Sequence, residues 1–102
     1  MKRSARIDAN QPEIVKCFRV NGFSVLHVHQ LKNCVDIMVS KGLVTAAVEI
    51  KDGSKCPSAR KLTEGELKFK NELQGLWYLC ESIEDADKIM QDMEEYIIIL
   101  NQ

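Results

Sequence analysis

The segment spanning residues 43–51 constrains the fold most, because it is almost entirely apolar and β-branched yet ends in the charged residues Glu49 and Lys51. This composition predicts a strand. Side chains of a strand alternate between two faces, so Glu49 and Lys51 share one face, while the other face is purely apolar. The alternation therefore predicts a core-facing side and an opposite side that carries an acid and a lysine, where an unpaired charge is costly.

A second strand is predicted over residues 35–39, joined to the first by a tight turn at residues 40–42. These two strands should form a hairpin. With the turn centred near Lys41, the residue opposite Asp36 falls close to Ala47. Glu49 is then a diagonal neighbour of Asp36, roughly 7 Å away or less.

The segment before this hairpin predicts a helix and an additional strand. Asn10 is a good N-cap, Pro12 suits the first turn, and Glu13 occupies the capping-box position. An Asn-Gly pair at residues 21–22 should end the helix. A strand is expected to follow at residues 23–28.

The C-terminal half predicts two helices around a buried strand. Thr63 and Glu66 form a capping box for one helix, and Ser82 begins the other. Between them, residues 76–80 form a continuous apolar run, as expected of a strand in parallel pairing. Residues 96–100 are strongly β-prone, so we expect a final strand or an apolar contact there.

The elements together predict an α/β fold with a mixed β-sheet flanked by helices, in the order helix, three strands, helix, strand, helix and a possible last strand. The 102 residues are enough for one domain. No apolar run is long enough to span a membrane, and no Gly-rich phosphate loop indicates an organic cofactor. The four cysteines lie far apart, which favours free thiols in a reducing cytoplasm. No signal peptide is visible at the N-terminus.

The hairpin is the candidate site of chemistry. Two neighbouring carboxylates, Asp36 and Glu49, can share a divalent ion such as Mg²⁺, for which Mn²⁺ could substitute. A bound metal ion generates a nucleophilic hydroxide and offsets charge on a phosphoryl group, and Lys51 could help to position the attacking water or stabilise the charge that develops. The alternative is an ordinary solvated ion-pair face at a strand end. His27 and His29 match no common zinc module.

The pattern of Val35-Asp36, a spacer of twelve residues and Glu49-Ile50-Lys51 resembles the signature of the PD-(D/E)XK nuclease superfamily. More specifically, the chain resembles small phage-type endonucleases of the VRR-NUC and Holliday-junction-resolvase-like group. This resemblance spans roughly residues 6–90 and implies a restriction-endonuclease-like fold and a phage or prophage origin in a bacterial host. The stretches that carry it are Arg6-Ile7-Asp8-Ala9-Asn10-Gln11, Glu49-Ile50-Lys51-Asp52-Gly53-Ser54 and Pro57-Ser58-Ala59-Arg60-Lys61-Leu62-Thr63.

The resemblance implies a role for each residue that matches the family motif. Asp36, Glu49 and the main-chain carbonyl of Ile50 would bind the metal ion, and Lys51 would be the catalytic lysine. Family members often add a glutamate from the first helix, for which Glu13 is the candidate, although its place in a capping box explains it equally well. The family usually has proline where Val35 precedes the aspartate.

The expected substrate is DNA, whether duplex, branched or single-stranded. The net charge of −1 gives no strong overall attraction to nucleic acid, so local basic groups must supply it. A domain of this size is expected to act as a homodimer, with residues 96–100 as a candidate contact. The alternative is a DNA-binding or scaffold module of the same fold without catalysis. The candidate phosphate contacts are Arg3, Arg6, Lys55, Arg60 and Lys61.

Overall fold

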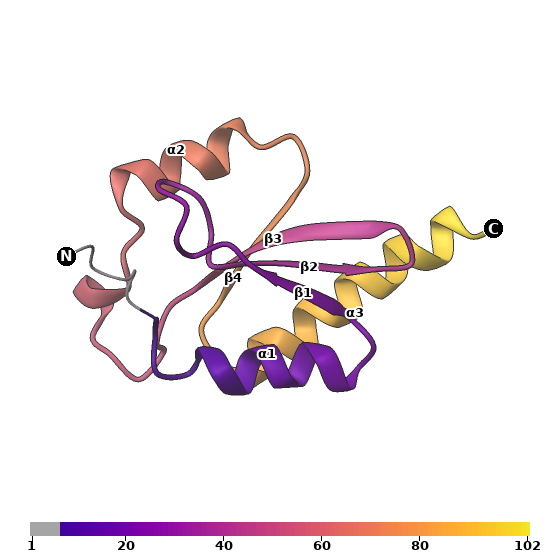
Figure 1. Cartoon of the computed structure of the whole chain (residues 1–102), viewed down its shortest axis with the longest axis horizontal. Coiled ribbons are helices and arrows are strands. Elements are labelled where there is room, and N and C mark those ends of the chain that lie inside the picture. The colour runs from indigo at the N-terminus through magenta and orange to yellow at the C-terminus, as the bar shows by residue number, and fades with distance from the viewer. Residues whose placement is uncertain (1–6) are drawn as a thin grey trace.

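The computed structural model describes residues 7–102. Figure 1 shows the arrangement of the elements. In chain order they are α1 (Gln11–Val20), β1 (Ser24–His27), β2 (Ile37–Lys41), β3 (Val44–Ile50), the 3₁₀ helix η1 (Pro57–Arg60), α2 (Glu64–Glu72), β4 (Leu76–Cys80) and α3 (Ile83–Leu100). None of the helices in this part of the chain combines the length and the apolar character that crossing a membrane requires.

The four strands form one mixed sheet in the order β1-β2-β3-β4. β1, β2 and β3 pair antiparallel, and β4 pairs parallel to β3. Helices α1 and α3 pack together below the sheet in Figure 1, whereas α2 lies above it. The predicted α/β class, with a mixed sheet flanked by helices, is confirmed.

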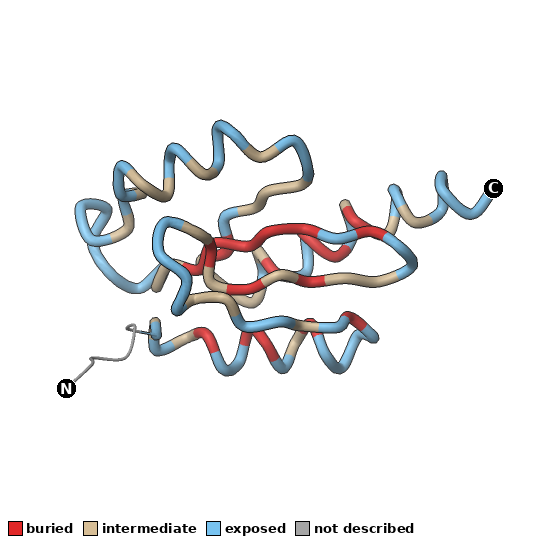
Figure 2. Tube along the Cα trace, turned by 45° about the horizontal axis from the view of Figure 1, so that its top comes forward, coloured by how far each residue is buried: buried red, intermediate tan, exposed pale blue. Residues whose placement is uncertain are grey.

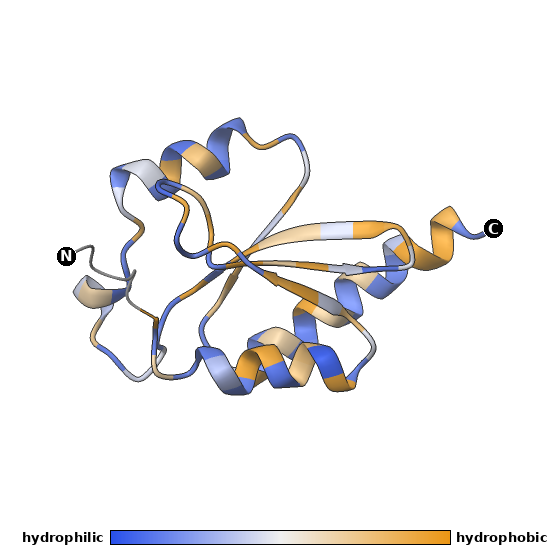
Figure 3. Cartoon of the chain, viewed as in Figure 1, coloured by the Kyte–Doolittle hydropathy of each residue, from blue (hydrophilic) through white to orange (hydrophobic). Residues whose placement is uncertain are grey.

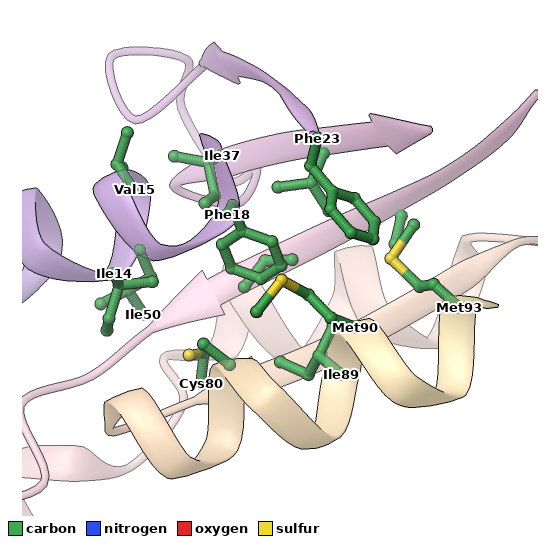
Figure 4. Close-up of a cluster of buried hydrophobic side chains, with 14 of the residues drawn as sticks. Ile14, Val15, Phe18, Phe23, Ile37, Ile50, Cys80, Ile89, Met90 and Met93 are labelled. Carbon is green, nitrogen blue, oxygen red and sulfur yellow. The ribbon is translucent and has the colours of Figure 1, made fainter. Parts of the chain in front are cut away.

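The core lies between the sheet and the pair α1 and α3 (Figures 2 and 4). Alternation along β3 directs Val44, Ala46, Val48 and Ile50 into this core, as the sequence predicts. Glu49 and Lys51 therefore project from the opposite face, on the side of α2.

The turn between β2 and β3 differs from the predicted one. It is formed by Gly42 and Leu43, with φ values of 56° and 71°, as a two-residue hairpin turn with two left-handed positions requires. The centre of the turn thus lies beyond Lys41. Ile37 pairs with Val48, and the same register places Asp36 directly opposite Glu49 instead of Ala47.

The predicted final strand at residues 96–100 is wrong, because α3 continues through Leu100. No Gly or Pro interrupts the segment after Ile83, so nothing ends the helix there. Met90, Met93 and Ile97 follow one another at helical spacing and pack in or against the core. Tertiary packing of this stripe overrides the local β-propensity of the three consecutive isoleucines.

Asn10 immediately precedes α1, as predicted, but the predicted capping role of its side chain is wrong. Asn10 has helical backbone angles and its side chain makes no capping hydrogen bond, so it forms no capping box with Glu13. Its Nδ2 instead donates to the carbonyl oxygens of Lys51 at 3.1 Å and Glu81 at 3.3 Å. Asn10 therefore connects the start of α1 to the ends of the parallel strands β3 and β4.

We expect Asn10→Ala to lower the free energy of unfolding by about 1–3 kcal/mol, because two carbonyls at the strand ends lose their shared donor. Urea denaturation measures this difference. Asn21→Ala is the matched control: the exposed side chain of Asn21 donates to the carbonyl of Cys17, and its backbone carbonyl, which accepts from Lys41, is kept in the variant, so the loss of this side chain should change stability by less than about 1 kcal/mol. Equal effects of the two substitutions would contradict the connecting role of Asn10.

Candidate active site

Asp36 and Glu49 come together where β2 begins and β3 ends. Extending the sheet register by one residue beyond Ile37 and Val48 puts Asp36 and Glu49 opposite each other on one face. The backbone N–H of Ile50 donates to Oδ2 of Asp36 at 2.7 Å, which fixes the aspartate against the edge of β3. The sequence correctly predicts that Asp36 and Glu49 are neighbours, and the observed register makes them direct rather than diagonal ones.

Glu49 is a buried acid, only 3% exposed. Burial raises the pKa of Glu49 far above its usual range, and the charge of Asp36 raises it further. Both effects disfavour the ionised form, since a second negative charge beside Asp36 has little access to water. A cation placed between the two carboxylates would reverse this balance.

Lys51 comes two residues after Glu49, directly after the end of β3, and its ammonium group lies among acids. Its Nζ is 2.9 Å from Oε1 of Glu66 and 3.7 Å from Oε2 of Glu49. Although partial burial alone would lower the pKa of Lys51, the hydrogen bond and charge of Glu66 prevail and raise it. Lys51 is therefore a positively charged group fixed beside the carboxylate pair.

Glu66 on α2 is a functional candidate that the sequence identified only as a capping residue. The predicted capping box is confirmed: Glu66 accepts from the N–H of Thr63 at 2.8 Å, and its own N–H donates to Thr63 Oγ1 at 3.1 Å. The same carboxylate binds Lys51. Partial burial would raise the pKa of Glu66, but these hydrogen bonds lower it, so the group is ionised. Glu66 thus couples the start of α2 to the lysine on β3.

A hollow of about 290 Å³ opens beside these groups. It is lined by Asp36, Glu49, Thr63, Glu66 and the loop at residues 29–35, which leads into β2. The loop rests on α2, because a β-carbon at Gly65 would collide with the side chain of Asn33. His29 also lines the hollow, and its Nδ1 is buried with no hydrogen-bond partner among residues 7–102.

Glu13 lies elsewhere. It lines a separate hollow of about 580 Å³, together with Asp52, Arg60 and Glu81. The structure therefore does not bring Glu13 into the group formed by Asp36, Glu49 and Lys51, and neither does the capping box account for it.

The predicted phosphate contacts differ in how free they are to bind a ligand. Lys55 and Lys61 are exposed. Arg60 is committed within the protein, since Nη1 is 2.8 Å from Oε2 of Glu81 and Nε donates to the carbonyl of Lys55. Arg3 and Arg6 lie outside the described residues.

Asp8 is a residue that sequence reasoning missed. Burial raises its pKa first and the charge of Asp36 second, while Lys55 and Lys51 lower it, which places this carboxyl near the same charges. Asp8 precedes α1 and belongs to no periodic element. The only available signal was its position within the stretch of residues 6–11 that resembles the nuclease family.

The oxygen atoms of Asp36, Glu49 and Ile50 are of the type that binds a hard cation, but they are few. Among residues 7–102, no three His, Cys, Asp or Glu side chains are arranged to hold a metal ion. The carbonyl of Ile50 is a main-chain candidate, because the N–H and C=O of one strand residue point to the same side and this N–H points to Asp36. Two carboxylates and one carbonyl are enough for Mg²⁺, which usually keeps several water molecules.

No protein-family model, no curated protein and no solved structure matches the chain.

Proposed function

We propose that the protein is a metal-dependent endonuclease that hydrolyses phosphodiester bonds of DNA. The observation that carries this proposal is a buried glutamate directly opposite an aspartate, with a charged lysine two residues further along the strand. A buried acid beside a second acid is unfavourable by itself, and a divalent cation would offset this. Acids that lie beside a hollow and have strongly shifted pKa values are typical of active sites.

In the proposed mechanism Asp36, Glu49 and the carbonyl of Ile50 would hold Mg²⁺ or Mn²⁺. The ion would supply a nucleophilic hydroxide and neutralise phosphate charge. Lys51 stabilises the negative charge that develops on the phosphoryl oxygens. Glu66 keeps the Lys51 ammonium group ionised and in place.

Nucleic acid would approach the hollow over basic groups that face solvent. Lys32 belongs to its lining, and Lys55 and Lys61 are exposed in the segment that follows β3. Such contacts to the phosphate backbone position DNA without reading its sequence. Arg60 contributes less than the sequence suggests, because Glu81 already neutralises it.

The proposal is tested by incubating the protein with supercoiled plasmid, branched duplex and single-stranded DNA in the presence of Mg²⁺ or Mn²⁺. We expect nicking or cleavage of at least one substrate and none in the presence of a chelator. Asp36→Asn, purified in parallel, is the control against contaminating nucleases. Wild-type protein that cleaves no DNA with either ion would refute the proposal, and cleavage that survives Asp36→Asn would refute the site.

A DNA-binding module without catalysis is the second candidate. It is favoured by the finding that residues 7–102 arrange no third metal-binding side chain around Asp36 and Glu49. A gel-shift measurement alongside the cleavage assay distinguishes the two functions, since this module would bind DNA whether or not a divalent ion is present and leave it intact.

A further inference from the structure

The C-terminal end of α3 carries apolar side chains that the chain itself leaves exposed. Figures 1 and 3 show this apolar end of the helix projecting beyond the sheet. Residues 97–100 are Ile, Ile, Ile and Leu. Because successive helix residues are about 100° apart, these four point in every direction around the helix. A helix that is apolar all round is typically surrounded by protein.

Only one side of this last turn is covered. Ile97 packs so closely on the β2–β3 hairpin that a β-carbon at Gly42 would lie 2.7 Å from its Cγ2. Ile98, Ile99 and Leu100 remain 58%, 64% and 61% exposed, and Tyr96 is 44% exposed. The remaining sides of the turn therefore lack the cover that their composition requires.

Leu43, next to Gly42 in the hairpin turn, extends this surface. Its side chain is 93% exposed and its φ is 71°, a left-handed conformation that is unfavourable for a bulky residue. Strained residues that persist in a fold often serve a function. A leucine held in this way and left in solvent has a use if another molecule covers it.

We propose that Leu43, Tyr96, Ile98, Ile99 and Leu100 form the contact surface for a second copy of this chain. At the exposed fractions given above, these five residues present on the order of 500 Å² of surface, compared with about 800 Å² per partner in a standard interface. This is also near the upper end of the largest apolar patches on monomers, about 300–600 Å². Two such surfaces together bury on the order of 1,000 Å², close to the least that a specific interface needs, so the contact fits a reversible dimer.

Charge favours a second copy over a membrane as the partner. Residues 96–102 carry no side chain that is charged at neutral pH, so two identical surfaces meet without repulsion, as a symmetric contact requires. The last turn has no basic residue, and Glu94 and Glu95 precede it. A helix that lies on a membrane surface normally has lysines or arginines on its polar face.

Sedimentation equilibrium on the full chain over a wide concentration range tests the proposal. We expect a reversible monomer–dimer equilibrium, and a rise of at least about tenfold in the dissociation constant of the double variant Ile99→Lys with Leu100→Lys. Lysine is chosen because a positive charge is compatible with a helix C-terminus. Leu26→Lys is the matched control: Leu26 is 63% exposed, but it lies on β1, and its loss should leave the equilibrium unchanged.

Leu43→Gly provides a second test in which folding cannot be confused with association. Glycine tolerates the left-handed conformation, so we expect the monomer to unfold at the same or a higher urea concentration while the dimer dissociates more readily. A wild-type chain that stays monomeric, even if it binds lipid vesicles, would overturn the proposal. So would dissociation constants unaffected by these substitutions, or changed equally by Leu26→Lys.

Discussion

Replacing Lys51 by alanine is expected to lower the rate of Mg²⁺-dependent DNA cleavage by about 10²–10³-fold, which is typical for the loss of one group that stabilises transition-state charge. Metal affinity should stay the same or increase, because the substitution removes a positive charge 3.7 Å from Glu49. Single-turnover cleavage kinetics and calorimetric titration with Mn²⁺ measure the two quantities separately. A parallel loss of metal binding would show that Lys51 positions the two carboxylates and does not stabilise the developing charge.

Glu66→Gln is the matched variant for this prediction. The amide oxygen can still accept from the N–H of Thr63, so the start of α2 should be retained, while Lys51 loses its charged partner. Since Glu66 raises the pKa of Lys51, its neutral replacement should shift the alkaline limb of the pH–rate profile to lower pH. An unchanged profile would contradict the role of Glu66 in holding the lysine charged.

The faces of the strands follow from the sequence alone, because alternation in β3 separates the apolar residues from Glu49 and Lys51. The register does not follow so directly. The register depends on which residues of the turn adopt left-handed backbone angles. Leucine rarely adopts them, so the sequence predicted a turn at residues 40–42 instead of at Gly42 and Leu43, and the predicted partner of Asp36 was two residues too early. The error of two residues kept Asp36 on the correct face, and the predicted neighbours were therefore the right ones.

The rest of the site depends on contacts between distant segments, which the sequence does not predict. An asparagine before a helix predicts a side-chain cap. Only the fold shows that the amide of Asn10 instead donates to carbonyls at the ends of β3 and β4. Glu66 is a capping residue by local pattern and a partner of Lys51 by tertiary placement. Local rules identify the first role and give no information about the second.

The C-terminal segment illustrates the same limit in secondary structure. Three consecutive isoleucines favour a strand locally, but the stripe that begins at Ala86 and Met90 continues in helical phase to Ile97. A helix that is already formed and packed extends by one hydrogen bond per residue, which is easier than starting a new strand without a partner. Helical periodicity read over the whole of α3 would have given the correct answer.

Replacing Glu49 by glutamine is expected to have opposite effects on stability and function. Without metal, the variant should be more stable than the wild type by about 1–3 kcal/mol at neutral pH, because it removes an acid whose ionisation burial and Asp36 oppose. It should also show no cleavage activity and lack the increase in melting temperature that we expect Mg²⁺ or Mn²⁺ to give the wild type, since a metal ion that binds the folded state stabilises it.

The pH dependence of stability provides the sharper test. Above the ordinary pKa of glutamate the unfolded chain has released the Glu49 proton, whereas the folded protein, in which that pKa is raised, retains it. Between the ordinary pKa of glutamate and the raised pKa of Glu49, the folded state binds more protons than the unfolded chain. Metal-free wild-type protein should therefore lose stability as the pH rises between these two values. Urea denaturation at several pH values should show a smaller loss for Glu49→Gln and an unchanged one for Glu64→Gln, which alters an exposed acid on α2. If Glu49→Gln instead weakens the metal-free protein at every pH, Lys51 already satisfies Glu49 as an ion pair, and the physical reason for a cation between Asp36 and Glu49 is lost.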